Sequence, residues 1–141
     1  GKSEGEIKDL ISKAESEIEA ELRTNVLIIE DEPIIAADLE GLVEELGHSV
    51  DSIAATHTEA VKAAHLKKPG IVLADVQLAD GSSGIEAVEE ILQSYGVPVI
   101  FITAFPERLL TGENTEPTYL ISKPFKPENV KAAISQALFF Q

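Results

Sequence analysis

From residue 25 to the end of the chain, five short apolar runs alternate with stretches of helical periodicity. The runs cover residues 26–29, 50–55, 71–74, 97–103 and 119–122. Between them, apolar residues recur every three or four positions, which is the spacing of a helix with one buried face. Strands that are apolar on both faces are typical of parallel sheets, whose strands are joined by helical crossovers. The order therefore predicts a doubly wound α/β domain with a five-stranded parallel sheet.

Local signals mark where the intervening helices begin and end. Each predicted start carries a proline suited to a first turn or a hydroxyl residue placed to cap one. These residues are Pro33, Thr56 with Glu59, Ser83 with Glu86, and Pro127. Gly47 and Pro69 are stop signals after two of the helices. Residues 81–84 lack the lysine of a phosphate-binding loop and are interpreted as a turn that leads into a helix cap.

Residues 1–24 differ from the rest of the chain and predict an extra N-terminal helix. Their apolar residues form one stripe in an otherwise charged segment, and Ser3 with Glu6 is spaced like a capping box. The stripe is Ile7, Leu10, Ile11, Ala14, Ile18 and Leu22. Two interpretations stay open: a solvated linker helix packed on the next domain, or a helix that docks on another domain or chain. We therefore divide the chain into a junction segment, 1–24, and a domain, 25–141.

Composition excludes several classes of function. The net charge of −14 argues against a nucleic-acid surface. The absence of cysteine excludes disulfides, thiolate zinc sites and cysteine nucleophiles. No apolar run is long enough for a membrane span and no signal peptide is apparent, so we expect a cytoplasmic protein without a membrane partner. Because the chain starts at Gly1 and contains no methionine, we expect it to be the C-terminal part of a longer protein.

Polar residues follow four of the predicted strands. Residues 30–32, Glu-Asp-Glu, follow the first strand, and Asp75 follows the third. Thr103 ends the fourth strand, and Lys123 comes directly after the fifth. The carboxyl ends of parallel strands meet at one edge of the sheet, where ligands of such folds bind. We therefore expect these acids, the hydroxyl and the ammonium group to lie together.

This set of groups predicts phosphoryl transfer. Carboxylates packed together require a cation, and Mg²⁺ suits carboxylates combined with phosphate oxygens. Lys123 would pair with phosphate oxygens, Thr103 would donate a hydroxyl hydrogen bond, and Asp75 would be the nucleophile that forms an aspartyl phosphate. Taken singly, Asp75 could be a solvated turn residue, and Glu32 is interpreted only as an acid in the first turn of a helix.

The motifs that carry these residues resemble those of bacterial two-component receiver domains. They read VLIIEDEP, VLADVQLADGSSGIEA, VIFITAF and ISKPF, and they occur in order across residues 25–141. The resemblance implies a flavodoxin-like, CheY-like fold and phosphorylation by a histidine kinase or a phosphotransfer protein. It also implies that Asp75 is the phosphoacceptor, that Thr103 and Lys123 contact the phosphoryl group, and that the Lys123-Pro124 bond is cis.

The same resemblance implies a set of magnesium ligands. Asp31 would bind Mg²⁺ directly, and Glu30 would bind through water. Asp75 and the backbone carbonyl of Gln77 would complete the protein ligands.

The sequence departs from the usual receiver pattern in three places. Glu30 is one methylene longer than the more common aspartate. Leu120 stands where receivers often carry an aromatic residue, and Tyr119 is expected to face the opposite side of the sheet because strand side chains alternate. Residues 107–111 leave room for only a short helix.

One stretch narrows the resemblance further. Residues 101–125, FITAFPERLLTGENTEPTYLISKPF, are similar to the C-terminal receiver of PhyR-type anti-anti-sigma regulators of the alphaproteobacterial general stress response. That family implies a sigma-factor-like domain N-terminal to the receiver in the same chain. It also implies that phosphorylation frees this domain to capture an anti-sigma factor.

Two other functions remain as alternatives to a regulatory, non-enzymatic receiver. A Mg²⁺-dependent aspartyl phosphatase would use a second aspartate where this chain has Gln77, so turnover would be slow. A pseudo-receiver would keep the fold without being phosphorylated. The remaining conspicuous side chains are His48, His57 and His65, interpreted as surface residues without acid partners, and Phe139 with Phe140, which fit either core packing or an external contact.

Overall fold

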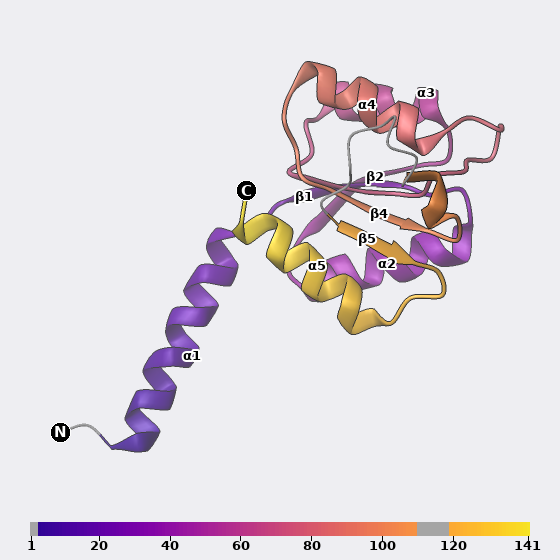
Figure 1. The fold of residues 1–141 in the computed structure, drawn as a ribbon. Helices are drawn as coiled ribbons and strands as arrows, with labels where there is room; N and C mark the ends of the chain where they lie inside the picture. Colours follow the sequence, from indigo (N-terminus) through magenta and orange to yellow (C-terminus); the bar gives the residue numbers. More distant parts are fainter. Residues whose placement is uncertain (1–2, 110–118) are drawn as a thin grey trace.

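The computed structural model describes residues 3–109 and 119–141, and in this part of the chain a parallel sheet is covered on both faces by helices (Figure 1). The strands are β1 (Asn25–Ile29), β2 (Ser49–Ala54), β3 (Ile71–Ala74), β4 (Val99–Thr103) and β5 (Tyr119–Ser122). They pair in parallel in the order β2-β1-β3-β4-β5. The doubly wound five-stranded fold predicted from the alternation is confirmed.

Helices cover both faces of the sheet (Figure 1). The helices α3 (His57–Leu66) and α4 (Gly84–Ser94) lie on one face, and α2 (Pro33–Glu45) and α5 (Pro127–Phe139) lie on the other. A short 3₁₀ helix, η1 (Pro106–Leu109), follows β4 where the sequence predicted a short helix over 107–111; residues 110–111 lie outside the described part.

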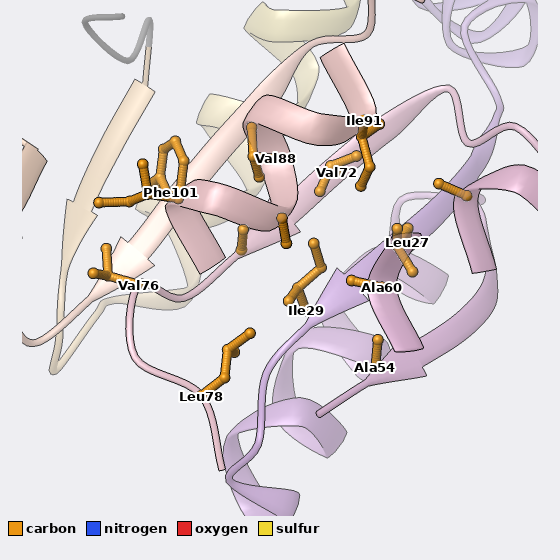
Figure 2. Packing of buried hydrophobic residues seen from close by; sticks show 14 of the residues in the cluster. Leu27, Ile29, Ala54, Ala60, Val72, Val76, Leu78, Val88, Ile91 and Phe101 are labelled. Atoms are coloured by element: carbon orange, nitrogen blue, oxygen red, sulfur yellow. The ribbon is translucent and has the colours of Figure 1, made fainter. Parts of the chain in front are cut away.

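The core consists of two apolar layers separated by the sheet. One layer, shown in Figure 2, joins α3 and α4 to the sheet through residues such as Leu27, Val72 and Ile91. The other joins α2 and α5 to the opposite face. All four residues of β3 are buried, as expected of a central strand with helices on both sides. In β5, Leu120 packs against the first layer and Tyr119 against the second, so the predicted opposite orientation of these side chains is confirmed.

The N-terminal helix α1 (Glu4–Glu21) projects away from the α/β body: its last turn lies beside the C-terminal end of α5, and its first turn lies far from the body (Figure 1). Its stripe residues Ile7, Leu10 and Ile11 are about half exposed, at 47%, 49% and 53%. Ser3 caps the helix by accepting a hydrogen bond from the Glu6 amide at 3.2 Å. The side chain of Ile18 lies outside the described residues. Among the described helices, none is both long and apolar enough to cross a membrane.

The prediction for two of the three histidines was wrong. His48 is buried because Gly47, with φ of 89°, turns the chain back after α2 and directs the ring inward, where Nδ1 accepts a hydrogen bond from the Thr24 amide at 3.1 Å. His57 has an acid partner, because α4 packs beside α3 and brings Glu90 within 2.5 Å of its ring. His65 is exposed, as predicted. Phe139 and Phe140 are 60% and 74% exposed, so they are not core residues.

Candidate functional site

The candidate site lies where β1, β3, β4 and β5 end, at one edge of the sheet. Backbone hydrogen bonds continue the strand ladder one residue beyond the strands and hold three of the predicted residues in place. The amide of Glu30 donates to Ala54. The amide of Asp75 donates to Ile29, and that of Lys123 donates to Thr103. Each of these bonds is 2.9 Å long, so the hydrogen-bond ladder of the sheet continues into the backbone of the site.

Lys123 joins the acids from different strands into one ionic cluster. Its Nζ donates to Asp75 Oδ2 at 2.8 Å and to both carboxylate oxygens of Glu30 at 3.0 and 3.2 Å. Glu32 lies next to the same ammonium group at 3.5 Å. Glu30 and Asp75 are only 2% and 7% exposed, and buried carboxylates of this kind are tolerated because a buried cation pairs with them.

Three of the acids are arranged so that one cation could contact them all. Glu30, Asp31 and Asp75 each offer a carboxylate oxygen, and these oxygens lie within 4.8 Å of one another. Asp31 is partly exposed, so the cluster is reachable from solvent. Hard oxygen donors next to an open face are the ligands that Mg²⁺ prefers, together with water and phosphate oxygens. The residues present therefore fit this metal.

Burial changes the protonation behaviour of the cluster. Burial raises the pKa of Glu30 from 4.5 to about 7, although Lys123 acts to lower it. Burial acts to lower the pKa of Lys123, but hydrogen bonds to Asp75 and Glu30 outweigh this effect and the pKa is raised. Lys123 is therefore a fixed positive charge, while Glu30 binds or releases a proton near neutral pH.

Asp75 is the first residue after β3, at the start of the loop that leads to α4. Its Oδ1 accepts a hydrogen bond from the Val76 amide at 2.6 Å, and its Oδ2 contacts Lys123. Thr103 is fully buried at the end of β4, and its Oγ1 accepts a hydrogen bond from the Phe105 amide at 3.0 Å. In the described part of the chain, no hydrogen bond links Thr103 to Asp75.

Gln77 lies in the loop after Asp75 with its side chain exposed, and it forms an antiparallel bridge with Ser83. The role of its carbonyl as a metal ligand stays a prediction. The predicted cis geometry of the Lys123-Pro124 bond is confirmed.

Sequence reasoning missed two contributors to the site. Glu32 was interpreted only as a first-turn acid, yet it contacts Lys123. Gly84, at the start of α4, donates a 2.7 Å hydrogen bond to Val76, and a Cβ at this position would lie 1.6 Å from the carbonyl oxygen of Asp75. The sequence did contain a signal for each: Glu32 is a third acid directly after Glu30 and Asp31, and Gly84 directly follows the Ser83 cap.

A parallel α/β domain with acids and a lysine gathered at its strand ends defines the receiver class of signalling domain. Residues 26–135 match the response regulator receiver domain, and the chain belongs to this family.

Within the family, the chain is similar to the receivers of PhyR proteins. It is 62% identical over 136 residues to the phyllosphere-induced regulator PhyR of Methylorubrum extorquens, covering 96% of this chain and 51% of that protein. The solution structure of the Erythrobacter litoralis PhyR receiver is 65% identical, with a TM-score of 0.81, covering 84% of this chain and 92% of that one. The crystal structure of PhyR from Brucella abortus is 59% identical with a TM-score of 0.79, covering 98% of this chain and 57% of that one.

The chain therefore spans about half the length of the Methylorubrum extorquens protein. A crystal structure of PhyR from Bartonella quintana, 60% identical to this chain, has that protein in complex with the anti-sigma factor NepR.

Proposed function

We propose that Asp75 is the phosphoacceptor of a response regulator receiver and that Mg²⁺ is its cofactor. One observation carries the proposal: the Lys123 ammonium lies 2.8 Å from Asp75, inside a cluster whose three carboxylates approach within 4.8 Å. A buried carboxylate next to a fixed cation and a metal-binding acid pair has the groups that phosphoryl transfer requires.

In the proposed reaction, a carboxylate oxygen of Asp75 attacks the phosphorus atom of a phosphorylated donor. A new bond forms between this oxygen and phosphorus, and the bond from phosphorus to the donor breaks, so that the donor leaves with the electron pair. The ammonium group of Lys123 neutralises charge on the phosphoryl oxygens, and the Thr103 hydroxyl donates to one of them. Mg²⁺, held by Asp31, Asp75, the Gln77 carbonyl and, through water, Glu30, would supply further neutralisation.

We further propose the partners that the family resemblance implies. The phosphodonor is a histidine kinase or a phosphotransfer protein in the cytoplasm. The receiver controls a sigma-like domain N-terminal to it in the same chain, with residues 1–24 as the junction and 25–141 as the receiver domain. Phosphorylation frees the sigma-like domain to bind an anti-sigma factor in general stress signalling. The similarity to PhyR, and the anti-sigma complex formed by the Bartonella quintana protein, support this proposal.

The phosphoacceptor is tested with acetyl phosphate and Mg²⁺, with intact-mass spectrometry as the readout. We expect one phosphoryl adduct on the wild-type chain, none on Asp75→Asn, and an unchanged adduct on Asp38→Asn. Asp38 is the matched control because it is an exposed aspartate in α2, outside the acid cluster and the loop after β3. An adduct that persists in Asp75→Asn would show that another residue is the acceptor.

The same experiment separates the alternative functions. A pseudo-receiver would gain no adduct, and its amide resonances would not move when beryllofluoride and Mg²⁺ are added. An aspartyl phosphatase would hydrolyse phosphate esters with turnover, which the exposed amide at Gln77 does not favour because it cannot act as a general acid.

The control of the upstream domain is tested with the full-length protein. We expect phosphorylation to increase its affinity for an anti-sigma factor, measured by calorimetry. Equal affinity with and without phosphorylation would contradict the proposed regulation while leaving the role of Asp75 intact.

A further inference from the structure

Residues 75–83 form the loop that contains the proposed phosphoacceptor, and hydrogen bonds connect this loop to the start of α3. We call this segment the acceptor loop. Its own hydrogen bonds close a tight turn, with the Gly81 amide donating to Leu78 at 3.0 Å and the Leu78 amide donating to Ser82 at 3.1 Å. These bonds shape the turn, but they do not determine where the turn sits relative to the rest of the domain.

Two hydrogen bonds, one between backbone groups and one from a backbone amide to a side chain, attach the acceptor loop to Ala55, before α3, and to His57, its first residue. The Ala79 amide donates to the carbonyl of Ala55 at 3.3 Å. The His57 amide donates to the side-chain hydroxyl oxygen of Ser82 at 3.1 Å. Ser82 in turn donates its hydroxyl hydrogen to Asp80. The end of the loop is therefore bound to a different helix from the one it enters.

The side chain of His57 extends the same attachment to α4. Its ring Nε2 lies 2.5 Å from a carboxylate oxygen of Glu90, which stands in α4 beyond the end of the loop. His57 therefore holds both the last part of the acceptor loop, through its amide, and the helix that follows, through its ring. The His57 side chain is partly buried, with 27% exposed, and that of Glu90 is 52% exposed.

We propose that His57, Ser82 and Glu90 form a clamp that positions the acceptor loop for Mg²⁺ binding, although none of the three is a proposed metal ligand. This inference rests on the proposed function. The loop contains Asp75 and Gln77, and Gln77 pairs with Ser83, the neighbour of Ser82. A small divalent ion tolerates little variation in the position of its oxygen ligands, so a loop that drifts outward would lose affinity for it. All three are thus positioning residues.

The clamp is tested by titrating each variant with Mg²⁺ alone and following amide resonances. The variants are Ser82→Ala, which removes the acceptor for the His57 amide, His57→Ala and Glu90→Ala. Outer-shell partners of metal sites typically change metal affinity by 10- to 100-fold, and for a clamp acting through the backbone we expect the Mg²⁺ dissociation constant to rise by about 3- to 10-fold. Hydrogen exchange should become faster in residues 76–83.

Further variants separate positioning from general stability. His65→Ala, at an exposed position of the same helix, should bind Mg²⁺ like the wild type. His57→Gln keeps a donor that can reach Glu90 and should restore most of the affinity. The effects of His57→Ala and Glu90→Ala should be less than additive in the double variant, because both remove the same contact.

The outcomes distinguish this inference from the proposed function. If the wild type binds Mg²⁺ and accepts a phosphoryl group, but the clamp variants only melt earlier and keep its dissociation constant, the clamp is overturned and the proposed function stands. If the wild type itself neither binds Mg²⁺ nor accepts a phosphoryl group, the proposed function and the clamp are both overturned.

Discussion

At the scale of single residues, burial and the neighbouring Lys123 act in opposite directions on the pKa of Glu30. A carboxyl group that is 2% exposed favours its neutral form, and burial raises its pKa from 4.5 to about 7 in spite of Lys123. The folded chain therefore binds this proton more tightly than the unfolded chain. By linkage, the stabilisation from this group is complete below about pH 4.5 and is lost as the pH rises through 7.

The first prediction follows from this sign. In chelator-treated protein, the free energy of unfolding of the wild type should fall relative to that of Glu30→Gln as the pH rises from 4.5 to above 7. The raised pKa of Glu30 limits this change in unfolding free energy to about 3 kcal/mol. Urea unfolding at a series of pH values measures it. A constant difference between the two proteins across this range would show that Glu30 does not carry the raised pKa.

Gly84 carries the second prediction. Because a Cβ would lie 1.6 Å from the Asp75 carbonyl oxygen, Gly84→Ala must displace the backbone of either α4 or the acceptor loop. We expect a loss of about 2 kcal/mol or more in thermal or urea unfolding, typical of overpacking.

The matched control for Gly84 is Gly41→Ala. Gly41 lies on the exposed side of α2, where nothing is within 4 Å of an added Cβ. Alanine there should raise stability by roughly 0.5–1 kcal/mol because it favours the helix more than glycine does. Equal effects of the two substitutions would contradict the close approach at Gly84.

At the scale of elements, α3 and α4 each begin at a residue whose side chain caps the helix, whereas α2 and α5 begin with a proline. Ser83 accepts hydrogen bonds from the amides of Ile85 and Glu86 at 3.1 and 3.4 Å, satisfying two donors that have no partner inside α4. Thr56 caps α3 in the same way by accepting from the Glu59 amide at 3.1 Å. Both residues were identified from their spacing to a following glutamate.

The third prediction concerns the Ser83 cap. Ser83→Ala should lower the free energy of unfolding by about 1 kcal/mol, the usual cost of losing an N-terminal cap. Ser94→Ala, at the exposed last residue of the same helix, should change it by less than about 0.5 kcal/mol. Chemical denaturation of the two variants makes the comparison, and a loss at Ser94 as large as that at Ser83 would mean that the cap is not what stabilises this helix.

At the scale of the whole molecule, α1 and the α/β body are separate in packing. No described residue of α1 belongs to either apolar layer of the core, and Figure 1 shows the helix leaving the body at one end. This arrangement suits the proposed role of residues 1–24 as a junction to an upstream domain.

The fourth prediction is that deleting residues 1–21 leaves the thermal midpoint nearly unchanged, since the described side chains of this segment, residues 3–15 and 17, are exposed. Residues 22–24 are kept because Thr24 is hydrogen-bonded to His48. Ile134→Ala, at a fully buried position of α5, is the comparison and should cost about 2–5 kcal/mol. A drop on deletion as large as that caused by Ile134→Ala would place α1 in the stabilising core.

The sequence alone determined the class of fold and the edge of the sheet at which to look for a site. Both are determined by local signals: apolar runs that are typical of buried parallel strands, caps that start helices, and polar residues placed directly after the runs. Strand ends of a parallel sheet meet whatever the details of packing, so Glu30, Asp75, Thr103 and Lys123 could be assigned to one edge before any distance was known.

Only the tertiary structure decided which of these groups touch and what surrounds them. The contact of Glu32 with Lys123, the burial of His48 and the pairing of His57 with Glu90 each join residues from different elements, and no spacing along the chain encodes them. The protonation of Glu30 was likewise decided by packing, because a pKa depends on how much water and charge the fold leaves around a group. Local patterns specify elements because neighbouring residues share a backbone, whereas contacts between elements arise only when the core has packed.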